Sequence, residues 1–282
     1  MTTTPQLPVP TWFVGCGNMG GAIVQGWRSA GLDLSSAIAI RPSGRPVEGV
    51  RTVASAAEAG SSPRLVILGV KPQKLDEAAA QIQSSLSERT VVVSLLAGIE
   101  TDSLRHRFPN VAAIVRAMPN IPVAIRRGVI ALFSKDADEA LRRQLSELFA
   151  PLGFAPWVPD EVKLAAVGSV AGAGTAYVAR FVDALRKAGE EWGLSREIAS
   201  VVALETVLGT AWLGATNRDS MDEIVRRVAS PNGTTEAGLA VLDQDRALDQ
   251  LVALTIEAAA RRGAELAAEA EAALLAGASQ LH

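Results

Sequence analysis

The sequence predicts an α/β fold in which a mostly parallel sheet domain is followed by an all-α domain. Up to about residue 158, short apolar runs alternate with stretches of helical character, and beyond that point nearly the whole sequence has helical character. A further observation concerns the core. Of the 282 residues, 49% are hydrophobic but only 4% are aromatic, so Ala, Val, Leu and Ile must form most of it. Those residues are typical of parallel sheets and of closely packed helices.

Six apolar runs in the first part have the length of strands, and they lie at 12–14, 37–40, 65–70, 91–95, 111–115 and 128–133. Helix-like stretches lie between several of them, at 18–30, 73–87, 101–107 and 136–149. Strands that alternate with helices form parallel sheets covered on both faces. The run at 65–70 has almost no polar alternation, as expected of a strand buried on both sides. The Thr- and Pro-rich residues 1–10 are expected to be poorly ordered.

The strand-like sequence ends within 151–161, a stretch that contains three prolines and one glycine. We therefore expect two domains, 1–158 and 159–282. Helices are predicted at 162–192, 195–215, 219–229, 234–243 and 245–276. The first of them is apolar nearly all round in its middle, and such a helix needs neighbours on every side. One small helical domain cannot easily supply them, so we expect a homodimer formed through these helices.

Composition excludes several classes of protein. The chain has 27 basic and 30 acidic residues and no basic cluster, which argues against a nucleic-acid partner. Cys16 is the only cysteine and there are two histidines, His106 and His282, so we expect neither an intramolecular disulfide nor a metal site. The N-terminus does not have the pattern of a signal peptide, and the longest uncharged apolar stretch, at 164–179, is too short to span a membrane. We expect a soluble cytoplasmic protein.

The sharpest motif is "GCGNMG", in which Gly15, Gly17 and Gly20 have the spacing G-x-G-x-x-G, with Asn18 and Met19 between the last two glycines. The motif directly follows an apolar run and directly precedes a predicted helix. In that context the glycines allow a tight turn and a close approach to a pyrophosphate, which lies at the helix N-terminus. The motif therefore predicts a Rossmann-like dinucleotide-binding domain.

The residues after the second predicted strand indicate which dinucleotide is bound. NAD-binding domains have an Asp or Glu there, which holds the ribose hydroxyls. Here the positions are occupied by Arg41, Ser43 and Arg45, with no carboxylate. A cation and a hydroxyl suit a 2′-phosphate, so NADPH is favoured and NADH is expected to be used less well. The alternative is that both arginines are solvated loop charges.

Three more turns follow predicted strands, and the carboxyl ends of parallel strands meet at one edge of a sheet, where ligands bind. Each turn taken singly could be an ordinary strand-to-helix connection, but three at one edge indicate a binding site. The residues concerned are Val70, Lys71 and Pro72 at the end of 65–70, Ala97 and Gly98 after 91–95, and Met118, Pro119 and Asn120 after 111–115.

The segments "GCGNMG", "VKPQ", "SLLAGI", "RAMPNIP" and "SPNGTTEAGL", in this order, resemble the pyrroline-5-carboxylate reductase family over about residues 12–262. The resemblance implies an enzyme that reduces the cyclic imine 1-pyrroline-5-carboxylate to L-proline with NAD(P)H, the last step of proline biosynthesis. It also implies a homodimer built from the C-terminal helices, in some members assembled further.

The resemblance also assigns a role to the loop at 230–235, which interrupts the helical second half. In the family this loop binds the substrate carboxylate with hydroxyls and backbone N–H groups at a helix N-terminus. By position, Ser230, Gly233, Thr234 and Thr235 are the expected contacts, with Asn232 in the turn. Thr235 is the candidate to touch the ring nitrogen and relay a proton, and Met118, Pro119 and Asn120 are expected to line the same site. The alternative is that the loop only caps a helix.

Two departures from the family pattern leave other functions open. The family has Gly-Gly where this chain has Asn232 and Gly233, and Ser-Gly-Ser-Gly-Pro-Ala-Tyr where this chain has "AGAGTAY" at 171–177. A related imine reductase with another ring substrate and a non-catalytic NADPH-binding sensor are therefore alternatives. The β-hydroxyacid dehydrogenases are a third, since "GSVAGAG" at 168–174 matches their glycine run, but the catalytic lysine that should follow is missing before Lys187. Cys16 is interpreted as a small residue of the phosphate turn rather than a redox group.

Overall fold

The computed structural model describes residues 5–279. The chain divides into two compact units, with boundaries at Ala173/Gly174 and Ala258/Ala259, so that the first unit contains both the sheet and the last part of the C-terminal helix. This division differs from the expected one at 158/159, which is a division by function and stays a prediction. The expectation of poor order for residues 1–4 lies outside the described residues.

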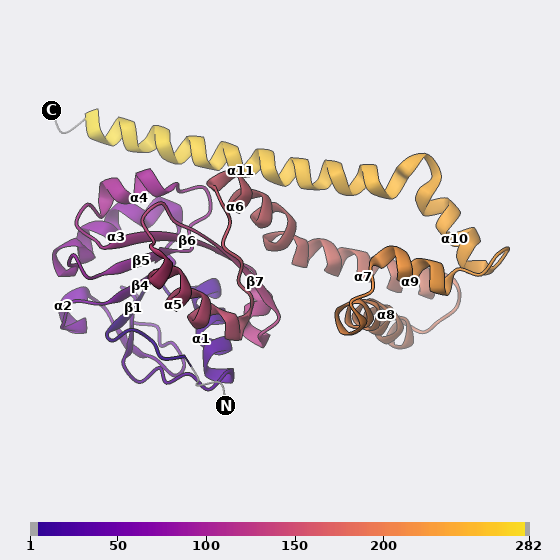
Figure 1. The fold of residues 1–282 in the computed structure, drawn as a ribbon, viewed down its shortest axis with the longest axis horizontal. Helices are drawn as coiled ribbons and strands as arrows, with labels where there is room; N and C mark the ends of the chain where they lie inside the picture. Colours follow the sequence, from indigo (N-terminus) through magenta and orange to yellow (C-terminus); the bar gives the residue numbers. More distant parts are fainter. Residues whose placement is uncertain (1–4, 280–282) are drawn as a thin grey trace. The chain divides into compact units, whose positions relative to one another are not determined.

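Within the described residues, the first unit contains one sheet of eight strands in the order β3-β2-β1-β4-β5-β6-β7-β8 (Figure 1). All neighbouring strands are parallel except β6 and β7, which run antiparallel. The mostly parallel sheet expected from the sequence is therefore confirmed. The strands are β1 Thr11–Val14, β2 Ala37–Ile40, β3 Arg51–Val53, β4 Leu65–Leu68, β5 Val91–Ser94, β6 Ala113–Pro119, β7 Gly128–Phe133 and β8 Gly153–Phe154.

Helices lie between most of the strands of the first unit, as predicted, but not between β2 and β3 or between β6 and β7. They are α1 Asn18–Ser29, α2 Ala56–Ala59, α3 Leu75–Ile82, α4 Thr101–Arg107, α5 Glu139–Phe149 and α6 Glu161–Val167. Short 3₁₀ turns at Pro72–Lys74 and Gln83–Ser85 flank α3, which is therefore shorter than the predicted helix 73–87. A third 3₁₀ turn, Ile121–Ile125, connects β6 to β7, and a fourth, Ala150–Leu152, precedes β8.

The sheet has a hydrophobic core on each face. Strand alternation divides the side chains between them, since Phe13 of β1 belongs to one core and its neighbours Trp12 and Val14 belong to the other. Helices α1 and α5 cover the Phe13 face, and α2, α3 and α4 cover the Trp12 face. The prediction that helices cover both faces is therefore confirmed.

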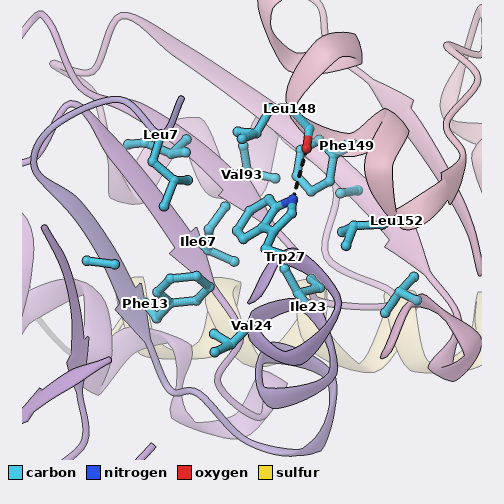
Figure 2. Packing of buried hydrophobic residues seen from close by; sticks show 14 of the residues in the cluster. Leu7, Phe13, Ile23, Val24, Trp27, Ile67, Val93, Leu148, Phe149 and Leu152 are labelled. Carbon is cyan, nitrogen blue, oxygen red and sulfur yellow. Dashed lines mark hydrogen bonds between the residues drawn. The ribbon is translucent and has the colours of Figure 1, made fainter. Parts of the chain in front are cut away.

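Trp27 of α1 lies at the centre of the Phe13 core (Figure 2). Its ring lies 6.0 Å from the ring of Phe13 and 5.5 Å from that of Phe149, measured between centroids. Its indole N–H donates a hydrogen bond of 2.9 Å to the carbonyl of Leu148, so the polar atom is satisfied in the interior. Leu7 is also buried in this core, so the expectation of a poorly ordered N-terminal stretch is wrong at that residue.

The second unit is helical, as predicted. It contains α7 Gly174–Glu191, α8 Arg196–Asn217, α9 Met221–Val228, α10 Thr234–Asp243 and the first part of α11 Ala247–Ser279, with a 3₁₀ turn at Gln244–Arg246 between the last two. The single helix expected at 162–192 is divided into α6 and α7 by a π-helical turn, Gly168–Gly172. None of the residues of α7 is buried. Several apolar side chains of α8 are at least half exposed, namely Val201, Val202, Leu204, Leu208 and Trp212.

By length and composition alone, two helical stretches of the described chain could cross a membrane, Glu161–Glu191 and Arg196–Asn217. The sequence-based expectation that no stretch is long enough is therefore wrong on this criterion, because a window containing a few charges can still be apolar on average. Helices in the core of a soluble protein have the same composition, so these two helices are weak evidence for a membrane location.

Candidate functional site

The glycine turn after β1 has the geometry of a phosphate-binding turn. Gly15 has a φ of +75°, and a Cβ on it would lie 2.4 Å from Cγ1 of Val70, so only glycine fits there. A Cβ on Gly20 would lie 3.1 Å from Sγ of Cys16. By contrast, a Cβ on Gly17 would meet nothing within 4 Å. Protein packing therefore requires the first glycine and constrains the third, whereas the second faces open space.

The N-terminus of α1 faces the same open space. Gly17 is its N-cap residue and supplies no side-chain cap, and the first turn contains no acidic residue. The amide of Gly21 donates to the carbonyl of Gly17 at 2.8 Å, so the amides of Asn18 and Met19 precede the first intrahelical hydrogen bond. An uncapped N-terminus of a twelve-residue helix carries a partial positive charge. This arrangement suits a pyrophosphate.

A cavity of about 570 Å³ opens at the carboxyl ends of β1, β2 and β4. Strand β1 has β2 on one side and β4 on the other, so the strand order reverses at this point, where open α/β sheets bind ligands. Six of the residues that the sequence marked for cofactor binding line this cavity: Gly15, Gly17, Arg41, Ser43, Val70 and Lys71.

A second cavity, of about 560 Å³, lies along α1 and shares Cys16, Gly17 and Arg41 with the first. Its charged lining consists of three arginines and one glutamate. Of these, Arg28 and Glu48 form an ion pair of 2.9 Å. Within the described chain, neither Arg41 nor Arg45 is ion-paired, and Nη1 of Arg41 donates to the carbonyl of Arg45 at 3.0 Å. Arg41, which lines both cavities, therefore has no carboxylate partner among the described residues.

Sequence reasoning missed some residues that line the two cavities and included others that line neither. Gln25 and Arg28 line the second cavity and Lys74 lines the first. Gln25 and Arg28 follow Asn18 at helical spacing on one face of α1, and this spacing could have predicted that they line the same cavity. Five expected cofactor contacts line neither cavity: Met19, Gly20, Pro72, Ala97 and Gly98. Of these, Gly98 has a φ of +74° in the turn after β5, so glycine is favoured there for backbone reasons.

Cys16 is buried between the two cavities and the helix. Burial raises the pKa of its thiol to about 11, although the charge of Arg41 opposes the shift. The thiol is therefore protonated at neutral pH and a poor nucleophile. This favours its interpretation as a small residue of the turn. Among the side chains that the structure describes, no group of three or more His, Cys, Asp or Glu could hold a metal ion.

The Met118–Asn120 segment lies at the carboxyl end of β6, which runs parallel to β5 and so reaches the sheet edge that the sequence predicted. Met118 and Pro119 belong to β6 rather than following it, because β7 pairs with this part of β6 and extends the strand. Asn120 is buried, and its side chain is engaged on both sides. Oδ1 accepts from the amide of Val129 at 2.8 Å, and Nδ2 donates to the carbonyl of Ala171 at 3.1 Å. Asn120 therefore links the end of β6 to β7 and to the π turn.

The π turn packs on the same segment. The amide of Ala173 donates to the carbonyl of Gly168 at 3.2 Å, and a Cβ on Gly168 would lie 3.3 Å from Cγ and Sδ of Met118. The turn overlaps the stretch in which this chain departs from the family pattern. Turns of this kind inside helices are frequent at functional sites.

The loop at 230–235 belongs to the second unit, where it connects α9 to α10. Asn232 has a φ of +57°, a left-handed conformation that Asn tolerates better than most residues. A Cβ on Gly233 would lie 2.4 Å from Oγ of Ser230 and 2.9 Å from the backbone carbonyl oxygen of Ser230, so the turn would have to shift to accept any other residue. The amide of Gly233 donates to the carbonyl of Ser230 at 2.9 Å and closes the turn.

Gly233 is the N-cap residue of α10, and no side chain caps that helix. The amide of Ala237 donates to the carbonyl of Gly233 at 3.2 Å, so the amides of Thr234 and Thr235 precede the first intrahelical hydrogen bond. The carboxylate of Glu236 accepts the amide of Asn232 at 2.6 Å. Like α1, α10 therefore begins with amides that no capping side chain accepts.

The strand order of the parallel sheet reverses at β1, and the glycine turn there leads into an uncapped helix. Beyond β2, Arg41 has no ion-pair partner within the described chain. These features define a dinucleotide-binding protein of the NADP-dependent oxidoreductase class. Two family models match the chain: "NADP oxidoreductase coenzyme F420-dependent" over residues 12–98, and "Pyrroline-5-carboxylate reductase dimerisation" over residues 161–266.

Relatives identify the family. The chain is 35% identical to a pyrroline-5-carboxylate reductase of Pseudomonas aeruginosa over 94% of its own length and 98% of the relative's. It is 31% identical to pyrroline-5-carboxylate reductase 2 of Bacillus subtilis over 90% of its own length and 94% of the relative's. The chain belongs to the pyrroline-5-carboxylate reductase family.

Solved structures agree with this fold. A pyrroline-5-carboxylate reductase from Coxiella burnetii is similar with a TM-score of 0.83 and 29% identity, covering 92% of this chain and 99% of the other. A pyrroline carboxylate reductase from Plasmodium falciparum, solved with NADP bound, has the same fold with a TM-score of 0.82. Its sequence is 23% identical to this one, and the match covers 92% of this chain and 98% of that chain.

Proposed function

We propose that this chain reduces 1-pyrroline-5-carboxylate to L-proline with NADPH, in the last step of proline biosynthesis. The observation that carries the proposal is a pair of uncapped helix N-termini at Gly17 and Gly233, each preceded by a turn that requires glycine. Two anions need such sites in this reaction: the cofactor pyrophosphate and the substrate carboxylate. The family to which the chain belongs supplies the identity of the reaction.

The cofactor residues fit a phosphorylated dinucleotide. Arg41 lies at the junction of the two cavities, Arg45 lines one and Ser43 lines the other, so a 2′-phosphate at the end of β2 would meet two cations and a hydroxyl. Arg28 would contribute less, because its charge is already paired with Glu48. We assign the preference for NADPH over NADH to these residues. When bound, NADPH supplies the hydride.

The chain's own residues have three tasks in this chemistry: to fix the substrate carboxylate, to orient the imine carbon and to pass one proton to the ring nitrogen. We assign the carboxylate to the amides and hydroxyls of Ser230, Gly233, Thr234 and Thr235. Thr235 is the candidate for contact with the ring nitrogen. A protonated imine is already a good electrophile, so positioning provides most of the rate enhancement and no strong acid is needed.

We assign Met118 and Pro119 to the wall of the substrate site. For Asn120 we propose an indirect role, because both polar atoms of its side chain already bind backbone groups of the fold.

The helical part of the chain supports a homodimer. Members of its family carry a dimerisation domain that matches residues 161–266, and the exposed apolar side chains of α7 and α8 lie in that range. We propose that these helices bury their apolar faces against a second copy of the chain. The two apolar helical stretches are then explained by an interface rather than by a membrane, and a cytoplasmic location follows. The functional division is a dinucleotide-binding part at 1–158 and a substrate-binding and dimerisation part at 159–282.

A second candidate is a related reductase that acts on a different cyclic imine. The observation that favours it is Asn232, which places an exposed side chain in the substrate loop at a position that is glycine in the family pattern. A bulkier loop could select a ring of another size or another position of the C=N bond.

The test is NADPH oxidation, followed by absorbance, with 1-pyrroline-5-carboxylate, its six-membered homologue and pyrroline-2-carboxylate as substrates. Thr235→Ala should lower kcat/KM by about tenfold or more, the typical effect of losing a proton-transfer or charge-assisted contact. Thr235→Ser is the matched control, because it keeps the hydroxyl and should retain most of the activity.

Turnover of 1-pyrroline-5-carboxylate that depends on the Thr235 hydroxyl would support the proposal. Turnover of only another ring would favour the second candidate. Tight NADPH binding without turnover of any of the three imines would refute an enzymatic function and indicate a nucleotide-binding sensor.

A further inference from the structure

Arg116 is a buried cation in the middle of the sheet, two residues before Met118. It is 5% exposed, and its Nη1 donates to Oε1 of Glu161 at 3.0 Å. Its Nε is also buried and has no hydrogen-bond partner among the described residues. A buried donor without a partner costs stability, and a buried ion pair is a weak source of stability compared with apolar packing. Stability alone therefore gives a poor account of this arginine.

Glu161, the first residue of α6, collects three donors on one oxygen. Besides Arg116, Oε1 accepts the backbone amide of Thr101 and the hydroxyl of Thr101, each at 2.8 Å. Burial alone would raise the pKa of Glu161, but these hydrogen bonds outweigh it and hold that pKa below its ordinary value. The carboxylate is therefore charged at neutral pH and firmly held.

The three donors come from segments that lead to the predicted site. Thr101 is the first residue of α4 and directly follows the loop after β5 that contains Ala97 and Gly98. Arg116 belongs to β6, the strand that ends in Met118 and Pro119. In the sheet it is paired in register with Ser94, the last residue of β5. A single carboxylate oxygen therefore joins the loop after β5 to the strand that carries the Met118–Asn120 segment.

Glu161 also anchors the helix that leads to the π turn. Helix α6 runs from Glu161 to Val167, and the π turn follows directly. The π turn returns to the same segment, through the packing of Gly168 on Met118 and the hydrogen bond from Asn120 to the carbonyl of Ala171. Both ends of this stretch therefore contact β6 or the residue just after it, one end at Arg116 and the other at Met118 and Asn120.

We infer that Glu161 and Arg116 are positioning residues, which fix the loop at 95–100 and the Met118–Asn120 segment relative to each other for hydride transfer. This inference rests on the proposed function, to which the substrate role of the segment belongs, and on the cofactor role that the sequence predicts for Ala97 and Gly98 in the loop. Neither residue touches the reacting atoms. Their effect is on geometry, and a displacement of about 1 Å at a reacting centre can cost a hundredfold in rate.

The test compares Glu161→Gln with the double variant Arg116→Met, Glu161→Gln. Glutamine keeps the size of the side chain and an oxygen that can accept from Thr101, but it removes the charge and leaves Arg116 without a charged partner. The double variant also removes the unpaired cation and its unpartnered Nε, so it should regain the Tm that the single variant loses. Glu139→Gln is the matched control, because Glu139 is also the first residue of a helix, α5, but is exposed.

We expect the dissociation constant for NADPH to rise about tenfold in both Glu161 variants, and kcat to fall by a similar factor, while Glu139→Gln leaves both unchanged. The double variant should regain Tm without regaining NADPH affinity or kcat. Recovery of all three in the double variant would show that the pair only stabilises the fold and would overturn the inference.

Failure of the proposed function can be distinguished from failure of this inference about Glu161 and Arg116. If the wild-type protein binds NADPH but reduces none of the imines, the proposed function fails. The NADPH dissociation constants still test the inference in that case, because the loop at 95–100 is its cofactor-side element. Equal constants in the wild type and Glu161→Gln would overturn it.

Discussion

At the scale of single residues, the three glycines of the turn after β1 differ in what an added Cβ would meet. Gly15 would collide with Val70 and has a left-handed backbone, so it is required by the fold. Gly17 has open space around it and a φ of −87°, which lies outside the left-handed region that favours glycine. We therefore expect the second glycine to serve the ligand and the first to serve the fold, although both belong to one sequence motif.

This difference predicts opposite phenotypes for two alanine variants. Gly17→Ala should keep a Tm close to that of the wild type but raise the dissociation constant for NADPH by about tenfold or more, because the methyl group occupies space meant for the pyrophosphate. Gly15→Ala should lower the Tm strongly, since backbone strain and a steric clash combine. Thermal unfolding and NADPH titration measure both effects. A Gly17→Ala variant that binds NADPH like the wild type would contradict the proposed position of the pyrophosphate.

Arg41 and Arg28 offer a second comparison at this scale, because both line the cavity along α1 but only Arg28 has a carboxylate partner. Arg41→Met should raise the KM for NADPH by about ten- to a hundredfold, the range for losing a charge-assisted contact to a phosphate. The KM for NADH should change little, because NADH has no 2′-phosphate. Arg28→Met is the control and should have a smaller effect on both. Equal losses for both nucleotides would show that Arg41 contacts a group that they share.

At the scale of elements, the strands and helices that the sequence predicted are those long enough to carry a pattern. Strands β3 and β8 have three and two residues, and α2 has four, so none of them shows a period. The end of β6 falls in the segment that the sequence predicts as a turn, because the apolar run ends at 115 and Pro119, which cannot donate a hydrogen bond, is unusual in a central strand. The π turn was missed because its glycines and alanines read as ordinary apolar helix.

The predicted site shows the same limit. The glycine turn was predictable because its three glycines, Gly15, Gly17 and Gly20, lie within six consecutive residues. The hydrogen bonds of Glu161 to Thr101 span 60 residues, and those of Asn120 to Ala171 span 51. Such contacts depend on how the chain packs, and a single sequence gives the residue types but no distances.

The hydrogen bonds of Glu161, which link α6 to α4 and β6, make the stability of the fold depend on pH. The pKa of Glu161 in the folded state lies below the ordinary value of 4.5, since hydrogen bonds from Thr101 and Arg116 favour the charged form. The charged groups that act on Glu161 are Arg116 on β6 and, more remotely, Lys135 after β7, which is paired with Asp102 of α4. The stabilisation is therefore complete above the ordinary pKa and is lost as the pH falls through the lower folded-state value.

The prediction is that the Tm of Glu161→Gln lies below that of the wild type at neutral pH and that the difference shrinks as the pH falls below about 4.5. Gln imitates the protonated acid, so the two proteins should converge once Glu161 is protonated. Thermal unfolding across the acid range measures this. Parallel curves, with the same difference at every pH, would show that the substitution acts through packing and not through charge.

At the scale of the whole molecule, the composition of the second half is explained by assembly. A helix such as α8 exposes Leu204 and Leu208, one turn apart on the same face, and each is more than half exposed. Soluble proteins rarely leave such faces uncovered. Helices α7 and α8 both lie in the range that matches the family's dimerisation domain. Burial against a second copy would account for the exposed apolar side chains of α8 and for the lack of buried residues in α7.

Leu204 and Leu208 of α8 allow the proposed dimer interface to be tested. Leu204→Glu combined with Leu208→Glu should convert the proposed dimer to monomers, because burying two carboxylates in an apolar interface without partners costs several kcal/mol. Helical content should persist, since both positions are exposed within one chain and Glu is a good helix former. Sedimentation velocity gives the mass and circular dichroism the helicity, with Gln144→Glu on α5 as the control for added charge. Monomers that retain NADPH binding but lose imine reduction would show that the sheet unit binds the cofactor by itself and that assembly serves the substrate step. An unchanged dimer would place the interface on other faces of the helices.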